Sequence, residues 1–293
     1  MNLALTVLEI VTPVFALAAI GFVWVKVGLE YRVQFVTRLA MTLGVPALIF
    51  VALMETEISP AALSRITLAA IAVYALLTAV AGLVIWGARL DGRTWHAPFV
   101  MSNTGNIGLP LAFFAFGDEG LGYAVAVFAV STVFAFTIGI WLVTRTTNPL
   151  NLIKEPMVGA TLLGGLFLWQ GWKTPEVVTN TLTLVGQLGI PLMLITLGVA
   201  IARITPTGIG RAALFAVGKV LICSAVAAAV GIYFELPPVA FGILVLQFAA
   251  PAAVTSYLIA EKYGADAQSV AGLVVLSTAL SVVSLPLILA AVL

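Results

Sequence analysis

Ten long runs of apolar residues follow one another along the chain, and short polar connections separate them. A helix needs about 20 consecutive apolar residues to cross the roughly 30 Å hydrocarbon core of a bilayer. The runs near or above this length span residues 5–28, 33–54, 66–88, 95–116, 121–144, 156–172, 177–201, 212–234, 238–260 and 268–293. The pattern predicts an all-α polytopic membrane protein with ten transmembrane helices.

The composition agrees with a membrane environment and narrows the function. Hydrophobic residues make up 62% of the 293 residues and charged residues 9%, whereas soluble domains carry about 25% charged residues. A net charge of +1 without a basic cluster excludes a nucleic-acid partner. With one cysteine, Cys223, and one histidine, His96, the chain cannot form an intrachain disulfide or a His-rich metal site. A transporter and a membrane enzyme remain as possible functions. We expect the lipid bilayer as a partner and no bound metal.

The distribution of cations predicts the orientation, because short connections rich in Lys and Arg stay in the cytoplasm. Only Arg65 and Lys173 lie on the side of the even-numbered connections, and Lys219 lies inside the eighth run. The other ten lie around the connections that follow odd-numbered runs: Lys26, Arg32, Arg38, Arg89, Arg93, Arg145, Lys154, Arg203, Arg211 and Lys262. We therefore expect both termini outside the cytoplasm.

Several short motifs recur about 145 residues apart, which indicates an internal duplication. The pairs are Thr12-Pro13 with Glu155-Pro156, Gly44-Val45-Pro46 with Gly189-Ile190-Pro191, Pro110 with Pro251, and Ser131-Thr132 with Ser277-Thr278. Coincidence is the alternative, since proline is common in membrane helices. A unit of five spans is odd, so its second copy enters the membrane from the opposite side. The sequence predicts two inverted five-helix repeats, residues 1–148 and 149–293.

Polar and helix-breaking residues interrupt the fourth and ninth runs near their middles. Residues 102–110 read Ser-Asn-Thr-Gly-Asn-Ile-Gly-Leu-Pro, and residues 247–256 contain Gln247, Pro251, Thr255 and Ser256. Gly and Pro weaken a helix, and non-helical backbone is tolerated at this depth only inside protein or along a cavity. A simple proline kink is the alternative. We expect breaks, with each proline starting a second half-helix whose positive end points into the membrane centre.

Two such helix ends, with amide and hydroxyl side chains around them, suit an anion. The candidate substrate-binding residues are Asn103, Gly105, Asn106, Pro110, Gln247, Pro251, Thr255 and Lys219. Lys219 has two interpretations, because an intramembrane charge is a candidate functional group, whereas a lysine about 12 Å deep can extend toward the cytoplasmic interface. If buried, it faces the carbonyl ends of half-helices or a substrate carboxylate. Its counterpart in the first repeat is Tyr74.

At these residues the sequence resembles the auxin efflux carrier family. The resemblance rests on Asn103-Thr104-Gly105-Asn106-Ile107-Gly108-Leu109-Pro110, on residues 189–198, on Pro251-Ala252-Ala253-Val254 with residues 260–264, and on residues 276–286. It implies two inverted five-helix repeats, as in bile-acid sodium symporters, with broken helices 4 and 9 crossing at the substrate site. Helices 1, 2, 6 and 7 would form a panel, helices 3–5 and 8–10 a moving core, and the panel helices a homodimer contact.

The resemblance also implies a substrate class and a location. Plant members have a long central hydrophilic loop that this chain lacks, and the Pro251 segment has no asparagine. A small organic acid from bacterial metabolism is therefore expected rather than auxin, with the protein in a bacterial inner membrane.

The leading hypothesis is a secondary active transporter that moves a small organic anion by alternating access. A sodium-coupled symporter of the bile-acid type is the alternative within transporters, and the coupling ion, sodium or proton, stays open because carbonyl, amide and hydroxyl oxygens can all bind sodium. A membrane-embedded enzyme would need an acid and a base at the membrane centre. No run has a carboxylate or histidine at its middle, since His96 lies near the start of the fourth. We therefore expect no enzyme and no cofactor.

Overall fold

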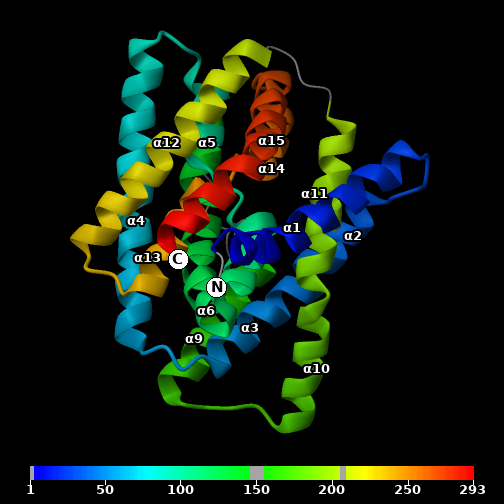
Figure 1. Cartoon of the computed structure of the whole chain (residues 1–293), viewed down its shortest axis with the longest axis vertical. Coiled ribbons are helices and arrows are strands. Elements are labelled where there is room, and N and C mark those ends of the chain that lie inside the picture. The colour runs from blue at the N-terminus through cyan, green and yellow to red at the C-terminus, as the bar shows by residue number, and fades with distance from the viewer. Residues whose placement is uncertain (1–2, 146–154, 205–208) are drawn as a thin grey trace.

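The computed structural model describes residues 3–145, 155–204 and 209–293, and helices make up almost all of this part (Figure 1). The predicted repeat boundary at residues 148 and 149, and Lys154, lie outside the described residues. The elements are α1 (Leu3–Lys26), α2 (Val33–Leu39), η1 (Ala40–Gly44), α3 (Val45–Glu55), α4 (Pro60–Gly87), α5 (Gly92–Val100), η2 (Thr104–Gly108), α6 (Leu109–Phe134), η3 (Ala135–Gly139), α7 (Ile140–Thr144), α9 (Pro156–Gln170), α10 (Glu176–Gln187), α11 (Gly189–Arg203), α12 (Ile209–Tyr233), α13 (Pro238–Ala249), α14 (Val254–Lys262) and α15 (Ala267–Val292). The elements η1 to η3 are π-helical turns inside longer helices.

Within the described residues, seven continuous helical segments are long and apolar enough to cross a membrane. They are Ala4–Lys26, Val33–Glu55, Pro60–Gly87, Thr104–Thr144, Glu176–Arg203, Gly210–Tyr233 and Ala267–Val292, and two shorter apolar helices are Pro156–Gln170 and Pro238–Ala249. The prediction of an all-α, multi-pass membrane protein is confirmed at this level.

The segment Thr104–Thr144 is too long for one crossing. Its 41 residues would extend about 60 Å as an unbroken helix, twice the hydrocarbon thickness. Gly117 interrupts it with φ 60° and ψ −148°, a conformation that only glycine adopts readily. The chain thus turns at Gly117, between the fourth and fifth predicted runs.

Helix ends coincide with capping residues in the polar connections. The side chains of Ser59, Asp91 and Asp266 accept hydrogen bonds from backbone N–H groups in the first turns of α4, α5 and α15. Hydrogen bonds from the side chain and the backbone N–H of Ser269 lower the pKa of the Asp266 carboxyl. Gly171 ends α9 in the left-handed conformation.

Helices α1, α2, α3, α9, α10 and α11 form one packed group through α1–α11, α3–α9, α3–α10 and α2–α11 contacts. We call it the glycine-packed group, because glycines allow close approach of its helices. A Cβ at Gly21 would overlap the Ile195 carbonyl oxygen, and one at Gly198 would overlap that of Ala18. A Cβ at Gly164 would lie 3.2 Å from the Phe50 carbonyl oxygen.

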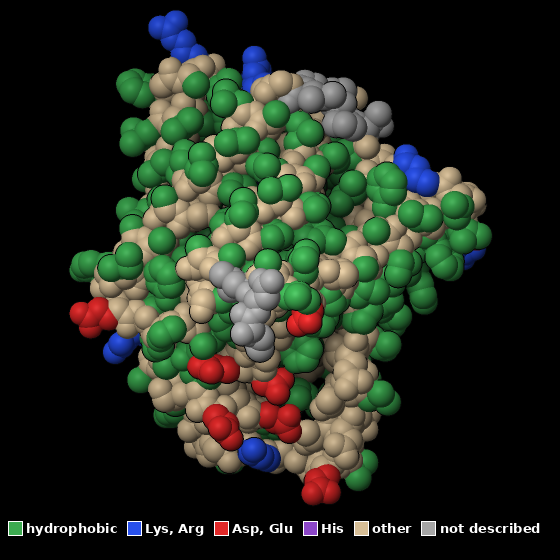
Figure 2. Space-filling view, in the orientation of Figure 1, with side chains coloured by type: hydrophobic (Ala, Val, Ile, Leu, Met, Phe, Trp, Pro, Cys, Tyr) green, Lys and Arg blue, Asp and Glu red, His purple; other side chains and the backbone are tan. Residues whose placement is uncertain are grey.

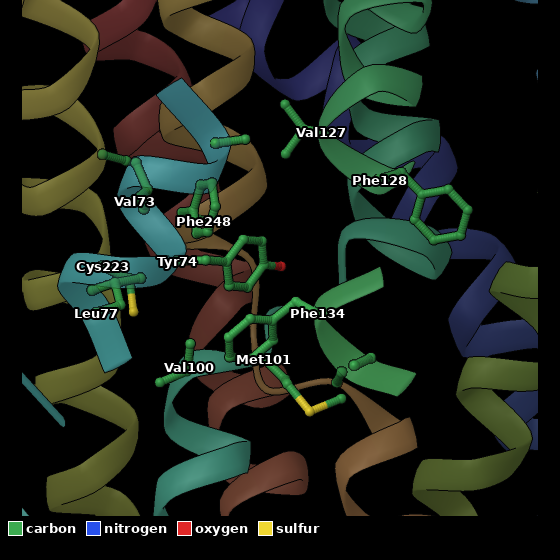
Figure 3. Packing of buried hydrophobic residues seen from close by; sticks show 14 of the residues in the cluster. Val73, Tyr74, Leu77, Val100, Met101, Val127, Phe128, Phe134, Cys223 and Phe248 are labelled. Atoms are coloured by element: carbon green, nitrogen blue, oxygen red, sulfur yellow. The ribbon is translucent and has the colours of Figure 1, made fainter. Parts of the chain in front are cut away.

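The remaining helices form a second group around α4 and α12, which lie side by side on one flank of the molecule (Figure 1). Helix α4 packs on α5 and α6, and α12 packs on α13 and α15. Tyr74 of α4 stacks on Phe134 with a centroid distance of 4.4 Å and meets Phe248 edge-on at 4.8 Å (Figure 3). This aromatic cluster connects α4 to the end of α13.

The charged side chains gather at two ends of the molecule. On the face in Figure 2, Asp and Glu lie in the lower half, whereas most Lys and Arg lie in the upper half. Arg93 donates to the carbonyl oxygens of Val143 and Tyr263 at one end. At the other end, Arg65 donates to the carbonyl oxygen of Glu235. An apolar belt therefore lies between two polar ends, as a bilayer requires.

The close contact between α1 and α11 generates a stability prediction. Gly198→Ala places a methyl group on the Ala18 backbone, which cannot move aside locally. We expect the free energy of unfolding to fall by about 1–3 kcal/mol, the range for overpacked sites, measured as a lower thermal unfolding temperature in detergent. Gly218→Ala is the control, because a Cβ at Gly218 of α12 meets nothing within 4 Å. Equal unfolding temperatures for the two variants would contradict this packing.

Candidate functional site

Both predicted helix interruptions are present, and they face each other. Helix α5 ends at Val100 and η2 begins at Thr104, while α13 ends at Ala249 and α14 begins at Val254. The Asn103 N–H donates to the Pro251 carbonyl oxygen at 2.8 Å, and the Ala253 N–H donates to the Met101 carbonyl oxygen at 3.0 Å. We call residues 101–103 and 250–253 the crossover segments. They form a short antiparallel pair, bridged at Ser102 and Ala252.

Side chains satisfy further polar groups of the crossover segments. The Ser102 hydroxyl donates to the Phe248 carbonyl oxygen at 3.0 Å. The Ala252 N–H donates to the Ser277 hydroxyl of α15, also at 3.0 Å. Unpaired backbone groups cost several kcal/mol at membrane depth. These bonds therefore explain how the chain leaves the helical path in the membrane interior.

The prolines do not start the second half-helices, so that prediction is wrong. Pro110 lies inside the helix, beyond η2, and Pro251 lies in a crossover segment three residues before α14. The two prolines therefore lie at different positions relative to the two breaks. They are not equivalent residues of the two predicted repeats. Asn103 provides the cap instead, because its Oδ1 accepts from the Asn106 N–H at 3.2 Å.

Two buried amides at the crossover have unused hydrogen-bonding atoms. Asn103 is 5% exposed and Gln247 is 1% exposed. Nδ2 of Asn103 and both side-chain polar atoms of Gln247 have no partner among the described residues. Gln247 packs against Gly108, where a Cβ would overlap its Oε1. Since buried polar groups are nearly always satisfied, these three atoms indicate a place for a polar ligand or water.

The turn η2 lies at the boundary between the two helix groups. A Cβ at Gly105 would come within 2.9 Å of the Phe128 ring and 3.4 Å of the Met193 methyl group on α11. Asn106 on the same turn is half-buried, and its side chain makes no hydrogen bond within the described chain. A molecule bound to η2 would therefore contact both groups.

Lys219 is fully enclosed behind the crossover segments. Its Nζ donates to the Phe99 carbonyl oxygen at 2.8 Å and to the Ser102 hydroxyl at 3.0 Å, and the side chain is 0% exposed. The interpretation that it extends to the cytoplasmic interface is wrong. The carbonyl end of a half-helix, α5, holds its ammonium group instead. Cys223, one turn further along α12, lies beside the same Phe99 oxygen.

The structure thus brings together six of the eight candidate residues at or beside the crossover segments: Asn103, Gly105, Asn106, Gln247, Pro251 and Lys219. Pro110 lies inside the helix that follows η2, and Thr255 is exposed on α14 without a hydrogen bond of its side chain to the described chain. Four further residues at the crossover were not among the predicted site residues: Ser102, Gly108, Phe128 and Ser277. Ser102 and Gly108 lie in the polar segment 102–110 and Ser277 in the segment 276–286, but only the fold reveals their partners.

A cavity of about 680 Å³ lies elsewhere, between α4, α6 and α9. Its lining is mostly apolar, and the exposed side chains of Leu68, Ile71 and Leu162 lie at its edge. Phe128 lines this cavity and also contacts the Gly105 position. The unused amide atoms are not part of it, so the cavity and the crossover are separate features.

Comparison with known proteins gives two matches. Residues 140–289, just over half of the chain, match a family model described as "Membrane transport protein". A protein of Methanothermobacter thermautotrophicus described as an "Uncharacterized transporter" is 27% identical over 296 residues, covering 95% of this chain and 96% of that protein. The similarity to this relative therefore includes both interruptions.

The unused atoms of Gln247 generate a prediction about stability. Gln247→Met keeps the length of the side chain but removes two unpaired polar atoms. Since each unsatisfied buried group costs about 1–3 kcal/mol, we expect a higher thermal unfolding temperature in detergent without substrate. Ser102→Ala is the comparison, because the Ser102 hydroxyl has two partners, the Phe248 carbonyl oxygen and Nζ of Lys219, and its loss should lower the unfolding temperature. A Gln247→Met variant as unstable as Ser102→Ala would mean that protein groups satisfy the amide.

Proposed function

The chain belongs to the membrane transport protein family, that of the auxin efflux carriers, and we propose that it is a secondary active transporter that moves a small organic anion by alternating access. Membership in a transporter family implies that the protein is not an enzyme. The observation that carries the proposal is the set of unused amide atoms beside paired, non-helical segments.

The chemistry around these atoms favours a carboxylate as the bound group. Asn103 Nδ2 and Gln247 Nε2 are unused donors, and a carboxylate accepts hydrogen bonds on both oxygens. The N-terminal end of η2, capped by Asn103, adds the partial positive charge of a helix start. No Asp or Glu is among the buried residues of the described chain. An anionic group would therefore meet donors without a competing negative charge.

Contacts between the two halves support ten spans in two inverted repeats. Gly21 packs on the Ile195 carbonyl, and Gly164 packs on the Phe50 carbonyl. These are equivalent contacts, since Gly164 follows Gly21 by 143 residues and Ile195 follows Phe50 by 145. Gly44 and Gly189, from the two equivalent Gly-x-Pro motifs, also meet, with the Gly44 Cβ position 3.0 Å from the Gly189 Cα.

A second pair of contacts supports the same symmetry. Lys219 holds the carbonyl of Phe99, the penultimate residue of α5, and Tyr74 packs on Phe248, the penultimate residue of α13. Lys219 and Tyr74 are themselves 145 residues apart. The first repeat would then end, and the second begin, in the connection between α7 and α9.

The two helix groups provide the parts for alternating access. In the proposal, the glycine-packed group is the panel of helices 1, 2, 6 and 7, and the group around α4 and α12 is the moving core. The substrate lies at η2, between Phe128 of the core and Met193 of the panel. A site at this boundary becomes open to either side when the core moves against the panel.

Polar contacts support the grouping of the connections into two sides, from which the proposed orientation starts. Arg93, Val143 and Tyr263 belong to connections assigned to the cytoplasm, and Arg65 and Glu235 to connections assigned to the opposite side. Each of these hydrogen bonds thus joins two segments assigned to the same side of the membrane. We propose that both termini lie outside the cytoplasm and that the protein resides in a bacterial inner membrane.

The proposal predicts that Asn106→Ala abolishes transport while the protein stays folded. Dicarboxylates, indole acids and bile acids, each with sodium or choline, are first screened for a rise in thermal unfolding temperature, because a ligand of the native state stabilises it. Uptake of the best stabiliser into proteoliposomes is then measured. We expect at least about a tenfold loss, equivalent to about 1.4 kcal/mol, because the half-buried amide faces the bound anion.

Asn180→Ala is the control for this substitution. Asn180 lies on α10, exposed and away from the crossover segments, and its loss should leave uptake unchanged. Wild-type uptake by Asn106→Ala would remove the central claim of the proposal.

A further inference from the structure

The cavity between α4, α6 and α9 has walls from both helix groups. Leu53 of α3 and residues 157–168 of α9 belong to the glycine-packed group, whereas residues 60–71 of α4 and 126–133 of α6 belong to the second group. The volume is about 680 Å³, within the range of small-molecule sites. The proposed function does not use this cavity.

The edge of the cavity is continuous with the surface that faces lipid. Leu68 and Ile71 lie on α4, within a segment long and apolar enough to cross a membrane, and Leu162 lies on the apolar helix α9. All three side chains are exposed. A molecule that enters past them comes from the hydrocarbon of the bilayer and not from water.

The cavity offers its occupant almost no hydrogen bonds. Its described lining residues include no charged side chain, and the hydroxyl groups among them belong to Ser64, Thr67, Thr132 and Thr161. Each hydroxyl donates to the carbonyl oxygen four residues earlier in its own helix, at 2.7–2.9 Å. A water molecule needs two to four polar partners. The lining therefore suits an apolar occupant, in contrast to the unused amide atoms of Asn103 and Gln247.

The dimensions of the cavity fit a hydrocarbon chain. Helix α4 begins at the lower end of the molecule (Figure 1), and its lining residues run from Pro60 to Ile71, about 17 Å at 1.5 Å per residue. Half of the hydrocarbon core is about 15 Å thick. Spread over this length, the volume of about 680 Å³ gives a mean cross-section of about 40 Å². A helix with side chains is about 10–12 Å wide and would not fit.

We propose that this cavity binds an acyl chain of a membrane phospholipid, from the leaflet in which α4 begins. An empty cavity would forfeit the dispersion contacts of its walls. A lipid chain can supply these contacts without dehydration, because the chains of the bilayer are as apolar as the lining residues. The proposed orientation assigns this leaflet to the non-cytoplasmic side.

Phe128 connects the bound chain to the candidate substrate site. It lines the cavity, and its ring lies 2.9 Å from the Cβ position of Gly105 on η2. In Figure 3 the ring points away from Tyr74 and the aromatic cluster. A chain in the cavity therefore packs behind a ring that contacts η2. Because both helix groups form its walls, the cavity changes shape when the core moves against the panel, so lipid should affect transport. This last step rests on the proposed function.

Two glycines of α9 provide a matched pair of variants. Gly165 lines the cavity, and a Cβ there meets nothing within 4 Å, so Gly165→Phe should place a ring where the chain binds. Gly159→Phe is the control, because a Cβ at Gly159 also meets nothing within 4 Å but this residue does not line the cavity. Phenylalanine is a better helix former than glycine, so both variants should fold.

The binding test uses phosphatidylcholine liposomes that contain some phosphatidylcholine with a diazirine in one acyl chain. After irradiation, mass spectrometry identifies the labelled residues. Wild type should be labelled at the cavity wall, at Ala126 and Thr132, which are buried, as well as at Leu221, which is exposed on α12. Relative to Leu221, Gly165→Phe should reduce the wall labelling at least about tenfold, and Gly159→Phe should leave it unchanged.

Three results would overturn the acyl-chain site. They are an unlabelled wall in the wild-type protein, equal wall labelling in Gly165→Phe, and labelling by a water-soluble diazirine carboxylic acid but not by the lipid. In the last case the cavity would take a soluble compound. If Gly165→Phe does not fold, Gly165→Leu replaces it, and the wild-type pattern still shows whether a chain enters.

The effect on transport is tested separately. A ring fixed in the cavity cannot leave, so Gly165→Phe should lower uptake at least about tenfold relative to Gly159→Phe, while substrate still raises its unfolding temperature. Equal uptake by the two variants would contradict the effect of lipid on transport. The labelling needs no substrate, so it tests the acyl-chain site even if Asn106→Ala transports like wild type and the proposed function fails.

Discussion

Pairing of two non-helical segments in the membrane interior is the constraint on which the rest of the structure depends. Residues 101–103 and 250–253 give up helical hydrogen bonds where no water can replace them. Their mutual bonds, from Asn103 to Pro251 and from Ala253 to Met101, satisfy part of this loss. Two further hydrogen bonds come from neighbouring helices, from Ser277 of α15 to Ala252 and from Lys219 of α12 to Ser102. Most helices of the second group are therefore held to one point.

Because the crossover segments are extensively hydrogen-bonded, the unpaired amide atoms of Asn103 and Gln247 are informative. The hydroxyls of Ser102 and Ser277 at the crossover have partners, whereas Asn103 Nδ2 and the Gln247 amide do not. In our proposal, these amide atoms are free because the transported molecule binds them. The exposed hydroxyl of Thr255 carries no such information, because water or headgroups can satisfy it.

Much of the fold and of the candidate site could be predicted from the sequence, because the lengths of apolar runs and their polar interruptions are local signals. The ten apolar runs, the breaks in the fourth and ninth, and the place of Gln247 beside the second break follow from them. The roles of Pro110 and Pro251 could not, since a π-helical turn of five residues after Asn103 shifts the helix start away from the proline. The partner of Lys219 depends on contacts 120 residues away, which no local pattern contains. The same holds for Gln247 against Gly108.

The burial of Cys223 has a practical consequence for observing the movement of such a protein. It is the chain's one cysteine and is 0% exposed in the structure, so its thiol is shielded from reagents dissolved in water. A cysteine introduced at an exposed position, such as Thr255, would then be the one site that reacts rapidly. A fluorescent or spin label there could report changes around α14, and a second introduced cysteine on α11 would give the distance between the two helices. Neither experiment would require removal of Cys223, which packs one turn from Lys219.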